Sequence, residues 1–459
     1  MAAKSPLFTY VAAGSANLMT FGVGMGYGWS SPSLPKLNGQ VDPQSIPLSI
    51  PTTVLQDSWI ASLLSLGAMC SPFITVFLSE IIGRKKTLLA FSFPMIVSHL
   101  IMIFATKVVD FYIARFMIGI SSGCMFSLIP VYTAEISQKH NRGLVGITLN
   151  IMLTLGHLTS SVVGPYVTIK MLSVVSLVPC VLFVVSFATL IPETPYFYVL
   201  VGKKQEAEVS LKKLRRSSAV EDELAEIVKS VEDLKLTERG NFGELFTRKH
   251  HLKALFWAVG IMFFQQFTGI IYVVSYTQKI FDAAHTSLSA DLEVMIVTAV
   301  QVIAVLLSTQ AIDRVARKTL MAASLVLMLL PNFFMGLYFY LLEFGYNLDP
   351  ISWLPVALLV IFISGFNVGI GPLGFTFAGE IFEPGVKCWG VTLATCTNLM
   401  VAFLTATFMP SVSEISGFYA PFWIFAGFTA VGIVFVYVFV PETKGKSFLE
   451  IQRSVRSEK

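Results

Sequence analysis

Uncharged amide side chains stand inside long apolar stretches of this chain. Gln265 and Gln266 are adjacent in the run 253–281, with Gly269 one turn further on, and Asn398 lies in the run 388–410. Burying such groups in an apolar medium is costly, so we expect them where something is bound. An amide donates and accepts hydrogen bonds without net charge, which suits a neutral ligand rich in hydroxyl groups. Hydrogen bonding between neighbouring helices is the alternative role.

A second polar group recurs at helical spacing. Asn150, Thr154 and His157 share one face if the run 144–167 is helical. His157 could line a pocket on that face. A packed, neutral histidine is an equally good interpretation, and the sequence leaves both open.

Composition places these residues in a membrane protein. Hydrophobic residues make up 54% of the chain and charged residues 13%, whereas a soluble domain carries about 25% charged residues. A helix that crosses a bilayer needs roughly 20 apolar residues. Candidate runs lie at 7–28, 58–79, 87–106, 111–133, 144–167, 171–191, 253–281, 293–312, 319–342, 352–378, 388–410 and 419–440. The first run could be a signal peptide, but its length and the lack of a convincing cleavage site favour a retained helix. The predicted fold class is all-α, with twelve transmembrane helices.

Charged motifs occur twice in the same order. The loop Glu80–Lys86 lies between two apolar runs, and Asp313–Lys318 lies between two others; each begins with an acid and ends in bases. Glu135 with Arg142 resembles Glu380 with Lys387, and Pro192-Glu193-Thr194-Pro195 resembles Pro441-Glu442-Thr443-Lys444-Gly445. Motifs repeated in one order predict two homologous six-helix halves, the layout of a secondary transporter.

Loop charges predict the orientation and the domains. Placing both termini in the cytoplasm gives the inner loops a clear excess of Lys and Arg, as the positive-inside rule requires. The predicted divisions are a six-helix half at 1–196, a cytoplasmic segment at 197–252, a second half at 253–441 and a cytoplasmic tail at 442–459. Apolar residues at helical spacing in the segment 197–252 predict short amphipathic helices, with a solvated linker as the alternative. Residues 30–57 are predicted to form an external loop.

The sequence gives no indication of a cofactor, a metal or an enzyme. The five cysteines lie in or at the ends of apolar runs and include no Cys-x-x-Cys pair, so they read as packing thiols. A nucleotide-binding loop is missing, because Val440 stands where the motif around Gly445-Lys446-Ser447 needs glycine. The net charge of +4 does not indicate a nucleic-acid partner.

Together these motifs resemble the sugar porters of the major facilitator superfamily. The resemblance rests on the two loops at 80–86 and 313–318, on Gln265-Gln266-Phe267-Thr268-Gly269, on Pro192–Pro195 and on Pro441–Gly445. Arg115, followed by Gly119, Gly123 and Pro130-Val131-Tyr132 before Glu135, is similar to the family's fourth span. The stretch from Gly28 to Pro35 looks like the end of span one in insect facilitated trehalose transporters. This resemblance implies a sugar as partner, a lipid bilayer as surroundings and a plasma-membrane location; a monomer is plausible.

The resemblance also implies a binding site and a gate. The implied sugar contacts are Gln265, Gln266, Asn398, Asn150, Gln301, Phe375, Asn367 and His157. The chain departs from the family at Ile271, where an asparagine is usual, at Phe375 and Leu399, where tryptophans are common, and at Asn367, where glutamate is frequent. The implied cytoplasmic gate consists of Arg84, Glu135, Arg142, Glu193, Arg317, Glu380, Lys387 and Glu442. These residues would pair across the halves when the inside is closed, although they could also serve only to set the topology.

The first span indicates whether transport is coupled to protons. Proton-coupled sugar porters carry a carboxylate there, at the position of Gly28, and this first span has no acid. We therefore expect facilitated diffusion, with proton symport as the alternative. A transporter-like sensor with little flux and a porter for non-sugar solutes, such as polyols or organic ions, are further alternatives.

Overall fold

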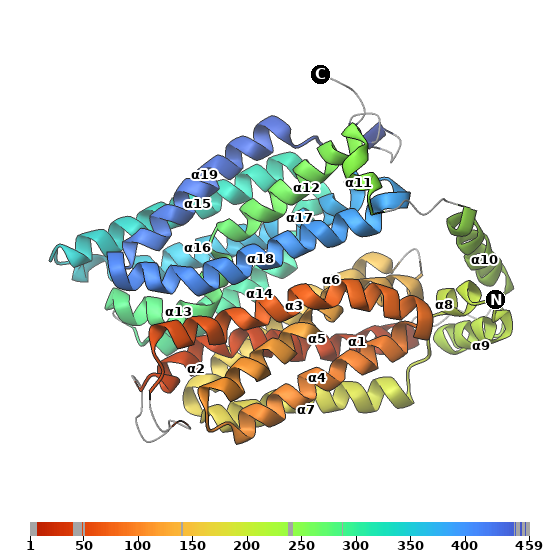
Figure 1. The fold of residues 1–459 in the computed structure, drawn as a ribbon, viewed down its shortest axis with the longest axis horizontal. Coiled ribbons are helices and arrows are strands. Elements are labelled where there is room, and N and C mark those ends of the chain that lie inside the picture. Colours follow the sequence, from red (N-terminus) through yellow and green to blue (C-terminus); the bar gives the residue numbers. More distant parts are fainter. Residues whose placement is uncertain are drawn as a thin grey trace.

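The computed structural model describes residues 7–39, 48, 51–138, 141–236, 242–286, 288–444, 446, 450, 451 and 455. These residues form helices and turns, and no strand occurs among them. The first half contains α1 (Leu7–Gly28), α3 (Val54–Ile82), α4 (Arg84–Phe104), α5 (Val108–Ile136), α6 (Arg142–Val163) and α7 (Ile169–Thr189). The second half contains α12 (Lys249–Phe267), α13 (Ile270–Ala284), α14 (Ala290–Arg314), α15 (Arg317–Glu343), α16 (Leu354–Val368), α17 (Ile370–Ile381), α18 (Pro384–Ser416) and α19 (Tyr419–Phe439). The halves form two bundles side by side (Figure 1).

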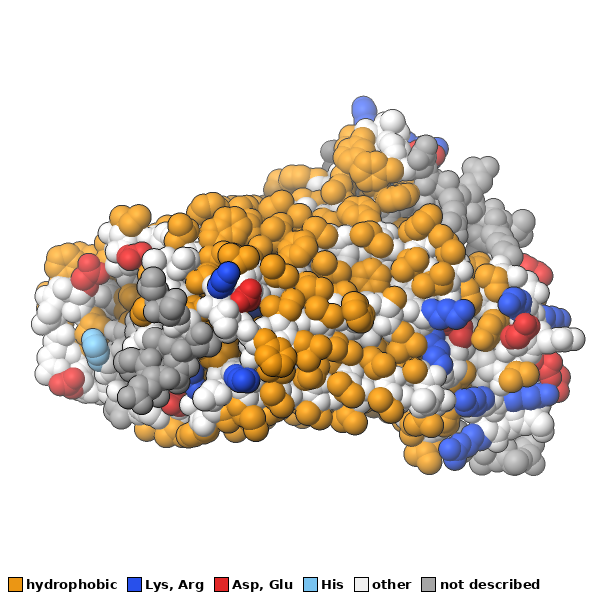
Figure 2. Space-filling model, turned by 60° about the horizontal axis from the view of Figure 1, so that its bottom comes forward, with side chains coloured by type: hydrophobic (Ala, Val, Ile, Leu, Met, Phe, Trp, Pro, Cys, Tyr) orange, Lys and Arg blue, Asp and Glu red, His pale blue; other side chains and the backbone are white. Residues whose placement is uncertain are grey.

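Eleven helical segments in the described part are long and apolar enough to cross a membrane. The one predicted span that is not among these eleven is the first, α1. It is helical over 22 residues but less apolar than the others, because it is rich in glycine and small polar residues. It packs against α6 and α7. Small residues allow this close packing: a Cβ at Gly24 would lie 2.1 Å from the carbonyl oxygen of Leu153. On the face shown in Figure 2, apolar side chains form a broad band over the middle of the molecule, and Lys and Arg side chains gather towards one end.

Two spans are broken in the middle. The seventh consists of α12 and α13, separated at Thr268 and Gly269, and Gly269 has φ of 90°. Glycine adopts this left-handed conformation without strain. The tenth consists of α16 and α17, separated at Gly369, so the break precedes Pro372. Broken spans expose backbone groups at membrane depth, which is where transporters of this layout bind their substrates.

Short helices mark the two ends of the bundles. The helices α8 (Pro195–Leu200), α9 (Lys204–Arg215), α10 (Glu221–Leu236) and α11 (Glu244–Thr247) lie at what we call the linker end (Figure 1). At the opposite end, which we call the α2 end, α2 (Ser30–Leu37) occupies part of the predicted loop 30–57, so that prediction was wrong for this stretch. Lys36 holds α2 in place by donating to the carbonyl oxygens of Gly164, Pro165 and Val167.

The two halves share an apolar core at the α2 end. One buried cluster contains most second-half core residues together with Trp29, Ile60 and Phe111, which lie where α1, α3 and α5 approach the α2 end. A second cluster, around Ala12, Met95 and Tyr132, belongs to the first half and includes Leu214 of α9, and a third lies within the short helices at the linker end. The halves also touch through α3 with α18 and through α6 with α14.

Candidate functional site

Three amides predicted as ligand contacts form one hydrogen-bonded network. Asn398 donates from Nδ2 to Gln265 Oε1 at 2.8 Å and to the carbonyl oxygen of Met262 at 3.1 Å. Gln266 donates from Nε2 to Asn398 Oδ1 at 3.0 Å. All three side chains are buried. The network joins α12 to α18 at the level of the break in span seven.

Gln265 also joins α12 to the break in span ten. Its Nε2 donates to the carbonyl oxygens of Ile370 at 3.0 Å and Gly371 at 2.8 Å. Gly374 lets this amide lie close to α17, since a Cβ there would stand 3.3 Å from Gln265 Oε1. Both ends of the Gln265 amide are therefore engaged within the protein. Its role in the structure is to position the two broken spans relative to each other.

Gln266 differs from its neighbour in having a buried acceptor without a partner. Its Oε1 has no hydrogen-bond partner among the described residues, although the side chain is only 8% exposed. A buried carbonyl oxygen left unpaired costs about 1–3 kcal/mol. The position therefore favours a ligand that brings a hydroxyl donor.

A separate polar contact joins α6 of the first half to α14 of the second half. His157 Nδ1 on α6 lies 2.9 Å from Gln301 Oε1 on α14. Because the amide oxygen can only accept, the imidazole donates from Nδ1. His157 is buried, while Asn150 on the same face, two turns nearer the linker end, is exposed. Thr154 bonds back to its own helix through the carbonyl oxygen of Asn150.

The remaining predicted contacts are less engaged with this network. Asn367 donates to the carbonyl oxygen of Ile363 within α16. Phe375 is 41% exposed on α17, directly after Gly374. Ile271 is half-buried and packs against the second-half core. We find that the structure joins Gln265, Gln266 and Asn398 directly, joins His157 to Gln301, and leaves Asn150, Asn367 and Phe375 outside these hydrogen bonds.

The buried arginine of the first half bonds to uncharged groups. Arg115 donates to the carbonyl oxygens of Gly26 at 2.6 Å and Ile60 at 3.0 Å, and to Ser30 Oγ at 2.8 Å. Gly28 is packed directly against α6, since a Cβ would lie 2.7 Å from His157 Cδ2 and 2.8 Å from the His157 carbonyl oxygen. There is consequently no room in this arrangement for a carboxylate at position 28.

The α2 end is closed by contacts that the sequence did not predict. Lys279 Nζ on α13 lies 2.6 Å from Asp57 Oδ2 on α3. The backbone N–H of Gln278 donates to Ser31 Oγ at 3.2 Å. Both contacts join the second half to the first. Their partners are more than 200 residues apart in the sequence, so no local pattern could have indicated them.

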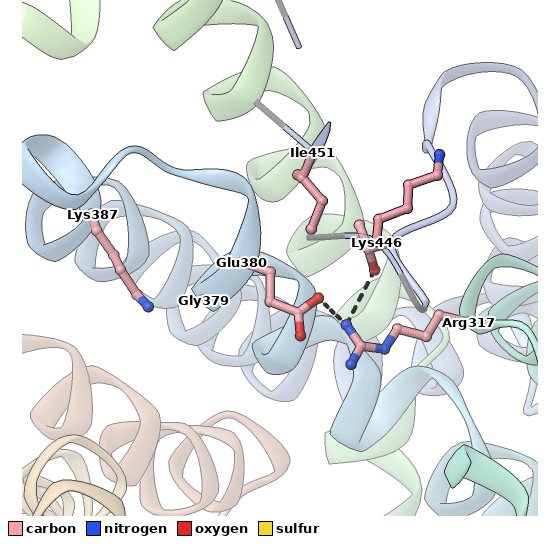
Figure 3. Close-up of a pocket in the computed structure, with 7 residues that line it drawn as sticks. Arg317, Gly379, Glu380, Lys387, Lys446 and Ile451 are labelled. Carbon is pink, nitrogen blue, oxygen red and sulfur yellow. Dashed lines mark hydrogen bonds and ion pairs between the residues drawn. The ribbon is translucent and has the colours of Figure 1, made fainter. Parts of the chain in front are cut away.

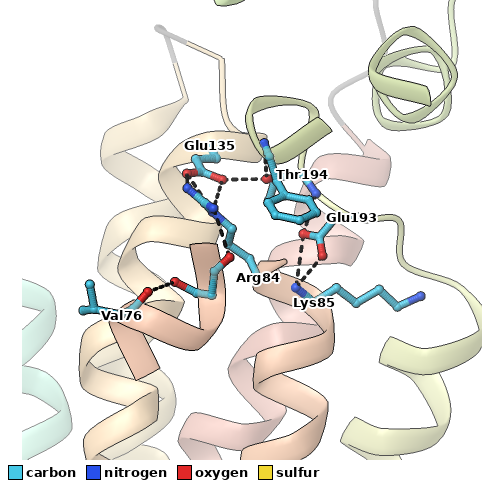
Figure 4. Close-up of polar contacts among 8 residues, drawn as sticks. Val76, Arg84, Lys85, Glu135, Glu193 and Thr194 are labelled. Carbon is cyan, nitrogen blue, oxygen red and sulfur yellow. Dashed lines mark hydrogen bonds and ion pairs between the residues drawn. The ribbon is translucent and has the colours of Figure 1, made fainter. Parts of the chain in front are cut away.

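At the linker end, the predicted gate carboxylates bond within their own halves. In the first half, Glu135 pairs with Arg84 at 2.9 Å and accepts from Thr194 Oγ1, and Glu193 accepts from the backbone N–H of Lys85 (Figure 4). In the second half, Arg317 pairs with Glu380, and Glu442 accepts from the backbone N–H groups of Arg317 and Lys318. Pairing across the halves stays a prediction for a state closed at this end.

Two further gate residues complete this picture. Lys387 is exposed and lines a hollow with Arg317 and Glu380 at the linker end (Figure 3). The backbone of Arg142 begins α6, but its side chain lies outside the described part of the structure.

Equivalent carboxylates in the two halves have opposite electrostatic surroundings. Burial raises the pKa of Glu193 above its ordinary value, and the backbone N–H groups of Thr194 and Lys85 offset only part of this effect. For Glu442, burial also acts to raise the pKa, but backbone N–H groups, including those of Lys444, Lys318 and Arg317, outweigh it and the pKa is lowered. Hydrogen bonds to a carboxylate favour its charged form, whereas loss of water disfavours it.

Comparison with known proteins agrees with this architecture. The family described as "Sugar (and other) transporter" matches residues 16–455. The facilitated trehalose transporter Tret1 of Culex quinquefasciatus is 33% identical, and the alignment covers 99% of this chain and 87% of that protein. Tret1 of Aedes aegypti is also 33% identical, over 98% of this chain but only 56% of its own length.

The fold is likewise that of a solved transporter. The inward open conformation of the xylose transporter XylE from E. coli matches with a TM-score of 0.81 at 20% identity, covering 97% of this chain and 99% of that one. At this identity the match concerns the fold. Together with the family match over nearly the whole sequence, it confirms the two-half, twelve-span architecture: the chain belongs to the sugar transporter family and is a multi-pass membrane protein.

Proposed function

We propose that the protein carries a neutral sugar, trehalose or a hexose, across the plasma membrane by facilitated diffusion. The buried, unpartnered Oε1 of Gln266 carries this proposal. It offers an acceptor to a sugar hydroxyl inside a network of uncharged amides. The relatives named above as facilitated trehalose transporters support the choice of sugar.

The sugar would reach the amides through the linker end. Polar and apolar contacts close the α2 end, while Asn150, which lies two turns nearer the linker end than His157 on α6, is exposed. The excess of bases in the linker-end loops supports a cytoplasmic location for that end and for both termini. The structure would then represent the inward-facing state of an alternating-access cycle.

Facilitated transport is favoured over proton symport by the surroundings of Arg115. A proton-coupled site needs a titratable group that changes charge during the cycle. The hydrogen bonds of Arg115 go to two backbone carbonyls and a serine hydroxyl, and Gly28 is closely packed against His157. This arrangement supplies no carboxylate that could exchange a proton with Arg115.

Counterflow tests the proposal directly. Purified full-length protein in liposomes loaded with unlabelled trehalose or glucose should accumulate the labelled sugar transiently, with and without a protonophore. Gln266→Ala should weaken the apparent affinity, while Asn347→Ala, an exposed amide in the loop after α15, should not. Absence of counterflow for both sugars in monodisperse protein would contradict the proposal. Sugar-dependent stabilisation without counterflow would instead support a sensor, and uptake into sugar-free liposomes that is driven by an imposed inward proton gradient would support symport.

A further inference from the structure

Two histidines and a glutamate meet at the linker end of the second half. His250 and His251 lie in the first turn of α12, and Glu383 immediately precedes α18. His250 Nε2 is 3.5 Å from Glu383 Oε1, and His251 Nε2 is 3.3 Å from Glu383 Oε2. One ligand atom from each residue lies within 4.8 Å of the others. The transport function proposed above does not use this cluster.

The hydrogen bond made by Nδ1 of His251 determines whether its Nε2 carries a hydrogen or a lone pair. Nδ1 lies 2.9 Å from the backbone carbonyl oxygen of Glu244. A carbonyl can only accept, so Nδ1 carries the hydrogen. In the neutral ring Nε2 then presents a lone pair, and it faces a carboxylate oxygen that also presents lone pairs. Either a proton, on the ring or on the carboxyl group, or a bound cation must therefore lie between them.

We propose that His250, His251 and Glu383 bind a divalent transition-metal ion, with Zn²⁺ as the best match. Two imidazole nitrogens and a carboxylate form a ligand set that zinc accepts, with bonds of about 2.0–2.2 Å. Tetrahedral geometry with such bonds separates ligand atoms by about 3.3–3.5 Å. The two measured distances are of this size, but His250 faces Oε1 and His251 faces Oε2 of Glu383, so the carboxylate would turn to bind the ion through one oxygen. The Nδ1–H of His251 donating to a backbone carbonyl is the outer-shell contact that orients a zinc-bound histidine.

The surrounding structure holds the three ligands in place. His251 is 3% exposed, while His250 and Glu383 are 23% and 19% exposed, so the site is buried on one side and open to solvent on the other. The open side leaves room for a water as the fourth ligand. Glu383 stands at the N-cap of α18, where the partial positive charge of the helix end favours an ionised carboxylate. Hard cations such as Mg²⁺ prefer oxygen ligands, so they should not compete.

The ion would tie the start of α12 to the turn between α17 and α18. Glu383 lies three residues after Glu380 and four before Lys387, both of which line the hollow at this end (Figure 3). The sequence predicted no metal here because the histidines and the glutamate are 132 residues apart. The adjacent histidines alone would not have indicated a third ligand.

The test uses full-length protein purified without a histidine tag and stripped with a chelator. Titration with Zn²⁺ against a fluorescent zinc indicator should give one site per chain. His250→Gln and Glu383→Gln should each weaken binding about tenfold or more. His285→Asn, a histidine exchange at an exposed position in the α2-end loop, should bind as the unaltered protein does; asparagine tolerates the left-handed backbone there. Zinc should also raise the melting temperature of the unaltered protein but not that of Glu383→Gln.

Each alternative has its own result. Equal zinc binding by the unaltered protein and by the double variant His250→Gln/Glu383→Gln would overturn the proposal. A second result would also overturn it: stripped protein that binds no zinc and whose melting temperature depends on pH only when Glu383 is present. A proton would then lie between His251 and Glu383 in place of the metal ion. If Glu383→Gln does not yield monodisperse protein, the partly exposed His250→Gln carries the comparison.

Discussion

Lys279 and Asp57 form an ion pair that closes the α2 end of the molecule across its two halves. The Nζ to Oδ2 distance is 2.6 Å, and the Asp57 side chain is 1% exposed. Asp57 also accepts from Thr52 Oγ1 at 2.6 Å, and Thr52 lies in its own half. Opening this end must therefore separate Lys279 from a carboxylate that remains held in the first half.

Lys279→Met should shift the protein towards the state open at the α2 end. The substitution leaves Asp57 buried without its cation in the closed state, and a loss of only about 1.4 kcal/mol changes a two-state equilibrium tenfold. A cysteine introduced at Ser31, which is 1% exposed beside Gln278, should react with an impermeant maleimide about ten times faster in this background. The Lys279→Met protein without Ser31→Cys gives the background labelling of the native cysteines.

Two controls separate this effect from a general loss of charge. Lys170→Met removes an exposed base at the same end, where Lys170 lies against the Phe104 ring, and should leave the labelling rate unchanged. Lys279→Arg should retain slow labelling. Fast labelling with Lys170→Met, or slow labelling with Lys279→Met, would show that the ion pair does not hold this end closed.

Gln265→Ala and Gln266→Ala should differ although the residues are adjacent. Gln265 makes two hydrogen bonds to the start of α17 and accepts one from Asn398, so its loss should lower both thermal stability and transport. Gln266 gives one hydrogen bond and holds an open acceptor. Its loss should weaken sugar affinity two- to tenfold, about 0.5–1.5 kcal/mol, with little change in stability. Melting temperatures and counterflow affinities measured on both variants test the difference, and identical profiles would remove the assigned roles.

Gly28→Ala should destabilise the protein, whereas Gly14→Ala in the same helix should not. A Cβ at Gly28 would lie 2.7–2.9 Å from atoms of His157 and Ser160, while a Cβ at Gly14 meets nothing within 4 Å. Relieving such an overlap requires α1 and α6 to move apart, at a typical cost of 1–3 kcal/mol. Thermal unfolding in detergent measures this cost. Equal melting temperatures for Gly28→Ala and Gly14→Ala would show that α6 can move away from α1 without loss of stability.

The sequence predicted the spans well because a bilayer imposes a long apolar run on each of them. The predicted run 7–28 has the same bounds as α1. The interruptions were harder to predict. Span ten is interrupted at Gly369, three residues before Pro372, and the break at Gly269 lies inside an unbroken apolar run. Backbone conformation at these glycines depends on neighbours such as Phe425, which a Cβ at Gly269 would meet at 2.4 Å.

The candidate site was predictable as a set of residue types but not as a set of contacts. An amide in an apolar run signals a buried polar function, so Gln265, Gln266 and Asn398 could be named in advance. Which amide keeps a free acceptor depends on how α12, α17 and α18 pack. The pairs Lys279–Asp57 and His157–Gln301 join residues from different halves, and one sequence holds no information on such pairs.

Glu193 and Glu442 should contribute to stability with opposite dependence on pH. The pKa of Glu193 is raised, so the folded state binds the proton more tightly than the unfolded chain, and stability falls as pH rises from the ordinary value of 4.5 through the raised pKa. The pKa of Glu442 is lowered, so its contribution is present above pH 4.5 and is lost as pH falls through the lowered pKa. Melting temperatures of Glu193→Gln and Glu442→Gln, recorded from pH 3 to 8 relative to the unaltered protein, should therefore diverge. Glu442→Gln should lower the melting temperature most near neutral pH and progressively less in acid.

Glu193→Gln should be better tolerated near neutral pH than in acid, because glutamine removes the buried charge and keeps one acceptor for the N–H of Lys85. Parallel pH profiles for the two variants would contradict the assignment of different surroundings to these equivalent carboxylates.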